Sequence, residues 1–260
     1  MASQMMNRLG GNLIQDIIPT ATIWPVTSPR HPPPQEGMKY KLGDGGHQDN
    51  SGLLPALQRK AKRVVMFVDT DVPISLKMDF CREKPYPMSE LGTSVTYYVI
   101  DKFGIAAHSE GGFTLRNQVF HFADLQPILC ELQTHRRAGR PALVERQLEV
   151  LQNSWWGIQG GWKVHLLLFY LDKSRLFEEQ LPRETQEEIA KGDKGEFAHF
   201  PQYSLMYENK KSLTAFTKPQ VNLLASYVEW AVRENDAHFR RALAENPGRS
   251  RTLDRRQARA

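Results

Sequence analysis

The chain has 260 residues, of which 40% are hydrophobic and 24% charged, a composition typical of a soluble globular protein of one or two domains. Its longest uninterrupted apolar run, Leu166 to Leu171, is far shorter than the roughly 20 residues of a membrane-spanning helix. Cys81 and Cys130 are too few for a disulfide framework or for most of a zinc site. We therefore expect a cytoplasmic protein without a metal or other cofactor.

The formal net charge of +5 arises at the end of the chain. Residues 240–260 carry seven arginines against two carboxylates, and basic and acidic residues balance in the rest. A nucleic-acid-binding domain needs a basic face on the fold itself, so we expect no nucleic-acid partner. The composition of residues 240–260 predicts a basic, flexible tail. Its arginines would be attracted to anionic lipid headgroups, so a peripheral membrane contact is kept as an alternative.

Residues 1–40 are rich in proline and predict an irregular lead-in. Apolar residues at helical spacing then predict a helix that starts near Ser51 to Leu53, with Asn50 or Ser51 as its cap and Pro55 in its first turn. The run from Arg63 to Val68 follows. It is short and rich in β-branched residues, as in a strand covered on both faces.

Further along, the aromatic and β-branched run from Val95 to Ile100 predicts a second strand, and residues 123–135 predict a helix. Alternating apolar residues at 143–151 and 162–171, with glycines between them, predict an antiparallel pair. Helices are expected at 181–190 and from Thr217 onward. The sequence thus predicts an α/β fold, a layered sheet with helices on both faces and an antiparallel extension.

The densest group of unusual residues is Gly43, Asp44, Gly45 and Gly46, just before the first predicted helix. Glycines around one acid allow a tight turn that leaves the carboxylate available as a general base. The alternative interpretation is an Asx-type turn that only reverses the chain. His47 and Asn50 are close enough in sequence to line the same pocket.

The wider segment from Leu42 through Asn50, Gly52 and Leu57 to the apolar run ending at Thr70 resembles the DGG-containing segment of patatin-like and cytosolic-phospholipase-like acyl hydrolases. Residues 116–120, 155–161 and 219–225 are similar to later blocks of these proteins. The resemblance covers residues 43–233. It implies the C-terminal part of such a catalytic domain at 41–239, with an incomplete three-layer sheet and flanking helices.

The resemblance also implies the chemistry. In these families a serine and an aspartate form a dyad without histidine and cleave ester bonds of phospholipids or other acyl lipids. Asp44 matches the dyad aspartate, and Gly43, Gly45 and Gly46 would shape its turn. An isolated aspartate with a pKa of about 3.9 is a poor base in water, so a dry pocket would have to raise the basicity of Asp44.

The sequence departs from the family at the nucleophile. The family's GxSxG elbow and glycine-rich oxyanion loop precede the aspartate, and neither occurs between Met1 and Leu42. We therefore expect this chain to carry one member of the dyad and to be inactive alone.

Two alternatives remain. Residues 107–111 resemble a nucleophile elbow around Ser109, which would make the chain a self-sufficient hydrolase, but the glycines after Ser109 make a poor helix start. In the second alternative, the chain is a non-catalytic scaffold that binds lipid or protein. Trp155, Trp156 and Trp162 then have two interpretations, core packing at a sheet edge or contact with lipid.

Overall fold

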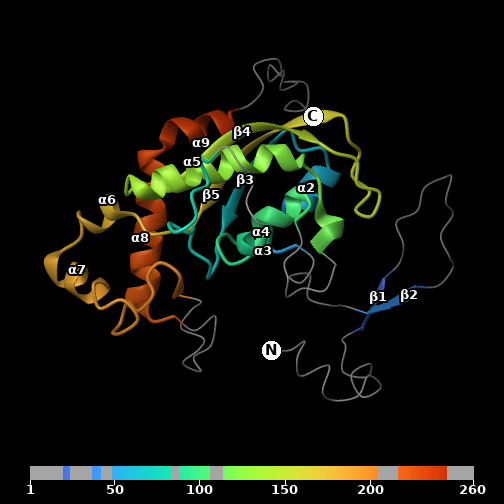
Figure 1. The fold of residues 1–260 in the computed structure, drawn as a ribbon. Helices are drawn as coiled ribbons and strands as arrows, with labels where there is room; N and C mark the ends of the chain where they lie inside the picture. Colours follow the sequence, from blue (N-terminus) through green and yellow to red (C-terminus); the bar gives the residue numbers. More distant parts are fainter. Residues whose placement is uncertain are drawn as a thin grey trace, which may run out of the picture. The chain divides into compact units, whose positions relative to one another are not determined.

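The computed structural model describes residues 20–23, 37–41, 49–82, 88–105, 114–203 and 216–244 (Figure 1). The chain divides into two units, Met1–His47 and Gln48–Ala260. The described helices include none that is long and apolar enough to cross a bilayer.

The first unit contains a short hairpin where the sequence predicted only an irregular lead-in. Strand β1 (Thr20–Ile23) pairs antiparallel with β2 (Met38–Lys41). The prolines that argued against a strand do not interrupt this ladder, because Pro25, Pro29 and Pro32–Pro34 fall between the two strands.

The second unit is a mixed α/β structure around a three-stranded sheet of order β3-β5-β4. Strand β3 (Arg63–Val68) runs parallel to β5 (Trp162–Tyr170), and β4 (Ala142–Val150) runs antiparallel to β5. The predicted antiparallel pair is confirmed. The helices are α2 (Leu53–Gln58), α3 (Met88–Leu91), α4 (Tyr97–Ile100), α5 (Leu125–Arg137), α6 (Arg175–Glu178), α7 (Arg183–Ile189), α8 (Lys218–Glu234) and α9 (Asp236–Leu243), with 3-10 turns η2 (Asp101–Phe103), η3 (Thr114–Asn117) and η4 (Phe122–Asp124).

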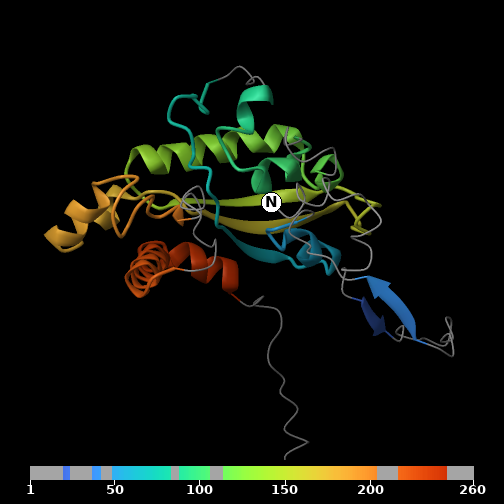
Figure 2. The ribbon, with the colours of Figure 1, turned by 90° about the horizontal axis from the view of Figure 1, so that it is seen from below.

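Helices cover both faces of the sheet because side chains alternate along the central strand β5. Leu166, Leu168 and Tyr170 join the apolar cluster formed with α2, α4 and α5. Leu167 and Phe169 join the second cluster, formed with α6, α8 and α9. Figure 2 shows α5 on one side of the strands and α8 and α9 on the other.

Strand β3 is covered less completely than its apolar sequence predicted. It lies at the edge of the sheet, and only Met66 and Val68 are buried. Phe67 stays 49% exposed although it stacks on Phe239 of α9. Strand β3 therefore ends the sheet formed by the described residues, which is where edge-to-edge association takes place.

The prediction of a strand from Val95 to Ile100 is wrong. Residues 97–100 form α4 and continue into η2. Val95, Val99 and Phe103 are all buried, and their spacing of four residues places them on one face of a helical turn. The β-branched and aromatic composition predicted a strand, whereas the spacing of the buried residues is helical.

Arg240 and Arg241, the first residues of the predicted basic tail, belong to helix α9, and residues 245–260 lie outside the described part of the chain. Arg241 binds the Glu145 carboxylate on β4 with Nη2 2.6 Å from Oε2. His238 Nδ1 lies 2.6 Å and His165 Nε2 2.7 Å from the same carboxylate. Hydrogen bonds from Arg241, His238 and His165 lower the pKa of Glu145 to about 2, although burial opposes the shift, so this anchor of α9 stays ionised.

The two cysteines, which are too few for a disulfide framework, are nevertheless bonded to each other. Cys81 and Cys130 form a disulfide with 4.6 Å between their Cα atoms. The bond attaches the segment after β3 to helix α5. Gln133 of the same helix supports this attachment, because its Oε1 accepts a hydrogen bond from Phe80 N at 3.1 Å.

A buried carboxylate at the end of β5 connects the two sides of the sheet. Asp172 Oδ2 lies 3.2 Å from Arg136 Nη1 of α5 and accepts the Ile74 amide at 2.9 Å. The Asp172 carbonyl accepts the Tyr227 hydroxyl of α8 at 2.7 Å. Burial raises the pKa of Asp172, and Arg136 opposes this shift.

Replacement of Arg136 by leucine would leave Asp172 buried without its cation. We expect Arg136→Leu to lower the free energy of unfolding by about 3 kcal/mol, measured by urea denaturation. The matched control is Arg183→Leu, which removes an exposed i,i+4 pair with Glu187 and should change stability by less than about 0.5 kcal/mol. Equal effects of the two substitutions would contradict the anchoring role of Asp172.

Candidate functional site

Most of the site residues proposed from the sequence lie outside the described part of the chain. These are Gly43, Asp44, Gly45, Gly46 and His47, together with Ser109. Asn50 is described and its side chain is exposed. The structure therefore informs on the turn that follows the DGG motif and on what holds that turn.

The turn between Asp49 and Leu54 closes the N-terminus of α2 with side-chain acceptors. Asp49 accepts hydrogen bonds from Ser51 N at 3.0 Å, Ser51 Oγ at 2.5 Å and Leu54 N at 3.1 Å. Ser51 Oγ accepts the Leu53 amide at 3.2 Å. Of the two predicted caps, Ser51 contributes, and the other acceptor is Asp49. Gly52 takes the N-cap position with φ of 67°, a conformation that favours glycine.

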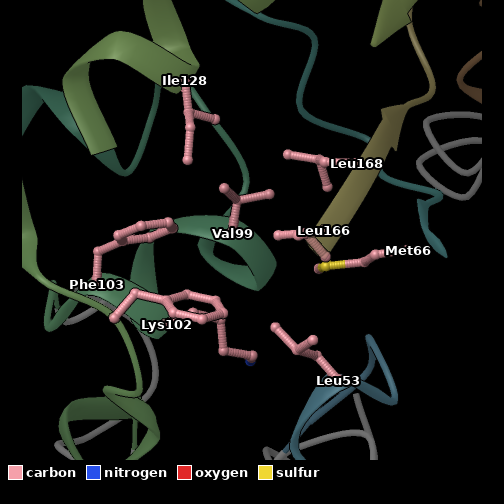
Figure 3. A pocket seen from close by; sticks show the side chains of 9 residues that line it. Leu53, Met66, Val99, Lys102, Phe103, Ile128, Leu166 and Leu168 are labelled. Carbon is pink, nitrogen blue, oxygen red and sulfur yellow. The ribbon is translucent and has the colours of Figure 1, made fainter. Parts of the chain in front are cut away.

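A buried lysine ties this turn to the η2 segment. Lys102 Nζ lies 3.2 Å from Asp49 Oδ1 and 3.0 Å from both carboxylate oxygens of Asp101. The Lys102 and Asp101 side chains are each only 2% exposed. In Figure 3 the Lys102 side chain lies among apolar side chains, including Leu53 of α2 and Met66 of β3.

The ion cluster continues to the β4–β5 connection through hydrogen bonds. Asn117 Nδ2 donates to Asp101 Oδ2 at 2.8 Å, and Asn117 Oδ1 accepts Trp156 Nε1 at 2.9 Å. We call Asp49, Lys102, Asp101, Asn117 and Trp156 the Lys102 network. It joins four segments that are far apart in the sequence.

The two carboxylates of the network differ in protonation behaviour. Burial raises the pKa of Asp49, but the Lys102 ammonium and the hydrogen bonds from Ser51 and Leu54 together bring it below its usual value. Burial dominates at Asp101 and raises its pKa despite Lys102 and Asn117. Asp49 is thus the firmly ionised partner of Lys102.

The cavity that the described residues form beside Lys102 is too small for a substrate. The adjacent cavity measures about 10 Å3, near the lower limit for one water molecule, and apart from Lys102 its lining is apolar. Among the described residues the network thus supports the Asp49 turn.

A larger cleft lies at the carboxyl end of β3. It has a volume of about 290 Å3 and is lined by residues of β3, β5 and α8 and of the segments that follow the two strands, namely Phe67, Val68, Asp69, Phe169, Leu171, Leu224 and Val228. Burial, and to a lesser extent the neighbouring Asp71, raises the pKa of Asp69, while the Thr70 amide opposes this. The cleft is suited to an apolar group with a hydrogen-bonding end.

Within the described ranges, no three His, Cys, Asp or Glu side chains are grouped so that they could hold a metal ion. The three tryptophans of the predicted hairpin differ in burial. Trp156 and Trp162 pack against the core, whereas Trp155 is 62% exposed.

Sequence reasoning missed the roles of Asp49, Asp101 and Lys102. A lone lysine next to an aspartate is usually a solvated surface pair, so no local pattern marks Lys102 as buried. Asn117 belongs to one of the blocks that carry the resemblance, but sequence reasoning assigned it no role.

Comparisons of the chain with protein-family models, with curated proteins and with solved structures found no match.

Replacement of Lys102 by methionine would leave Asp49 and Asp101 close together without a cation. We expect Lys102→Met to lower the free energy of unfolding by about 3 kcal/mol at neutral pH. The deficit should shrink towards about pH 4, because without the ammonium both carboxylates take up protons more readily in the folded state than in the unfolded state.

Chemical denaturation of both proteins across this pH range checks the prediction. Lys191→Met is the matched control, because Lys191 pairs with Glu188 at the surface and its loss should cost less than about 0.5 kcal/mol. A deficit that does not change with pH would show that Lys102 contributes by packing alone.

Proposed function

We propose that the chain carries the aspartate half of a serine–aspartate acyl hydrolase that acts on phospholipids or other acyl lipids. The DGG segment supplies Asp44, and the turn, helix and apolar strand that follow it occur in the order that the resemblance implies. The observation that carries the proposal is the buried ion pair of Asp49, five residues after Asp44, with Lys102. A catalytic loop needs fixed supports of this kind.

In the proposed reaction the Asp44 carboxylate accepts the proton of a serine hydroxyl while the serine oxygen attacks the ester carbonyl carbon. The alcohol leaves with the proton that Asp44 held, and the acyl group stays on the serine. Water then attacks the acyl-enzyme, Asp44 takes a proton from the water, and the fatty acid is released as the serine regains its proton. The serine belongs to a GxSxG segment that this sequence does not contain.

The test combines the chain with a polypeptide encoded upstream of Met1 in the same reading frame. We expect no hydrolysis of a nitrophenyl ester or a phospholipid by the chain alone, and turnover when the GxSxG-bearing segment is present. Asp44→Asn should then lower kcat about 10²–10⁴-fold, the usual contribution of a general base. The exposed Asp193→Asn is the control.

Two results would overturn the proposal. The first is an upstream frame without a GxSxG segment. The second is turnover by the chain alone that Ser109→Ala abolishes and Asp44→Asn spares, which would establish the self-sufficient hydrolase.

The apolar cleft supports a second candidate, a non-catalytic scaffold that binds an acyl chain. Leu224 lines the cleft, and Val221 lies one turn earlier on the same helix with 49% of its surface exposed. We expect Leu224→Trp to fill the cleft and weaken binding of a dansyl-labelled acyl chain about tenfold, roughly 1.4 kcal/mol. Val221→Trp should bind as the unmodified chain does. Fluorescence titration measures both, and equal affinities would exclude the cleft as the binding site.

A further inference from the structure

Two loops meet at the end of the sheet where β3 and β5 begin. One connects α2 to β3 and the other connects β4 to β5. His165 N of β5 donates to Lys62 O in the first loop at 2.8 Å, and Gln58 Nε2 of α2 donates to Trp156 O in the second loop at 2.5 Å, so each loop is bonded to the element next to the other. Figures 1 and 2 both show the β4–β5 connection beside α2 at this end.

The β4–β5 loop holds Trp155 in an exposed position. Trp155 is 62% exposed, although burial of a large apolar side chain stabilises a folded protein. The turn around it is well fixed. Asn153 and Ile158 exchange two backbone hydrogen bonds of 2.9 and 2.8 Å, and Asn153 Nδ2 donates to Arg116 O at 2.7 Å. The exposure of Trp155 is therefore a property of an ordered turn.

Cations lie against the aromatic rings at this end. The Arg116 guanidinium is 4.1 Å from the centre of the Trp155 ring, and Lys62 Nζ is 4.5 Å from the centre of the Trp162 ring. Such cation–π pairs place positive charge beside apolar surface.

The charge at this end is mainly positive. The segments 58–65, 114–118 and 151–163 contain no aspartate or glutamate, and their basic residues are Arg59, Lys60, Lys62, Arg63, Arg116 and Lys163. The strand register places one acid, Glu149, opposite Lys163. Glu149 belongs to β4, and all six cations belong to segments without a carboxylate. We call these six basic residues together with Trp155 and Trp162 the basic-aromatic edge.

We propose that the basic-aromatic edge docks on a membrane surface that contains anionic phospholipids, with Trp155 at the level of the headgroups. Tryptophan is enriched at membrane–water interfaces, and lysine and arginine side chains are attracted to an anionic bilayer. Neither the tryptophan contact nor the charge attraction gives stable binding alone, and the basic-aromatic edge combines the two. The inference goes beyond the acyl-hydrolase proposal and does not depend on it.

Single-stranded nucleic acid also binds to aromatic rings and cations, but it needs a groove that follows its backbone. Here the surface is the end of a hairpin, and Arg116 and Lys62 already occupy one face of the Trp155 and Trp162 rings. The arrangement favours a lipid surface, and nucleic acid is kept as an outcome of the test.

The experiment measures co-sedimentation of the full chain with phosphatidylcholine vesicles and with mixed phosphatidylcholine–phosphatidylserine vesicles. We expect Trp155→Ala to weaken binding to mixed vesicles about tenfold, and Lys62→Glu to reduce the preference for phosphatidylserine. Leu76→Ala and Lys173→Glu are the matched controls, because Leu76 is 49% exposed and both residues follow the opposite ends of β3 and β5. The arginines of residues 249–259 are present in every variant, so they affect all of them equally.

A second measurement separates insertion of Trp155 from a loss of folding. Brominated phosphatidylcholine should quench part of the tryptophan fluorescence of the unmodified chain, and Trp155→Phe should lose that part while its thermal unfolding is unchanged. The proposal is overturned if the unmodified chain binds neither vesicle, if Trp155→Ala behaves like Leu76→Ala, or if a single-stranded oligonucleotide displaces the chain from mixed vesicles.

Discussion

The packing of the helices against the sheet in the second unit depends on Asp172. Its carboxylate is fully buried, and the residue is bonded to groups on both faces of the sheet. A charged group in that position is stable only when cations and hydrogen-bond donors surround it. Arg136 reaches it from α5, the Ile74 amide from the segment after β3, and Tyr227 binds the neighbouring carbonyl from α8. Because these groups lie on both faces of the sheet, one residue fixes both layers of helices relative to β5.

Elements with strong local signals were predictable from the sequence. Alternation and glycines predicted the β4–β5 pair, and apolar spacing predicted α5 within two residues of its ends. The start of α8 was also predictable. Thr217 and Gln220 form a reciprocal capping box there, and Pro219 lies in the first turn, so three local signals agree.

The wrong and missing predictions share a physical cause. In each case the contact that decides the structure joins residues that are far apart in the sequence. Residues 97–100 have the composition of a strand, but the core they enter requires Val95, Val99 and Phe103 on one side. Cys81 and Cys130 are 49 residues apart, so their pairing depends on how α5 lies against the segment after β3. The burial of Lys102 likewise depends on Asp49, which lies in a different segment. The sequence showed the motif around Asp44, but it did not show that Asp49 pairs with Lys102.

The Lys102 network also relates the turn at Asp49 to the basic-aromatic edge. Trp156 follows the exposed Trp155 in the same turn, and its indole donates to Asn117, which in turn donates to Asp101. Lys102 then joins Asp101 to Asp49, so the bonded series runs without a gap from the hairpin turn to the residue five positions after Asp44. A carboxylate buried beside a second carboxylate tolerates little displacement of its only ammonium. The turn at Asp49 and the turn that presents Trp155 are therefore joined by one continuous series of ion pairs and hydrogen bonds, so a displacement of either turn would disturb the buried charges between them.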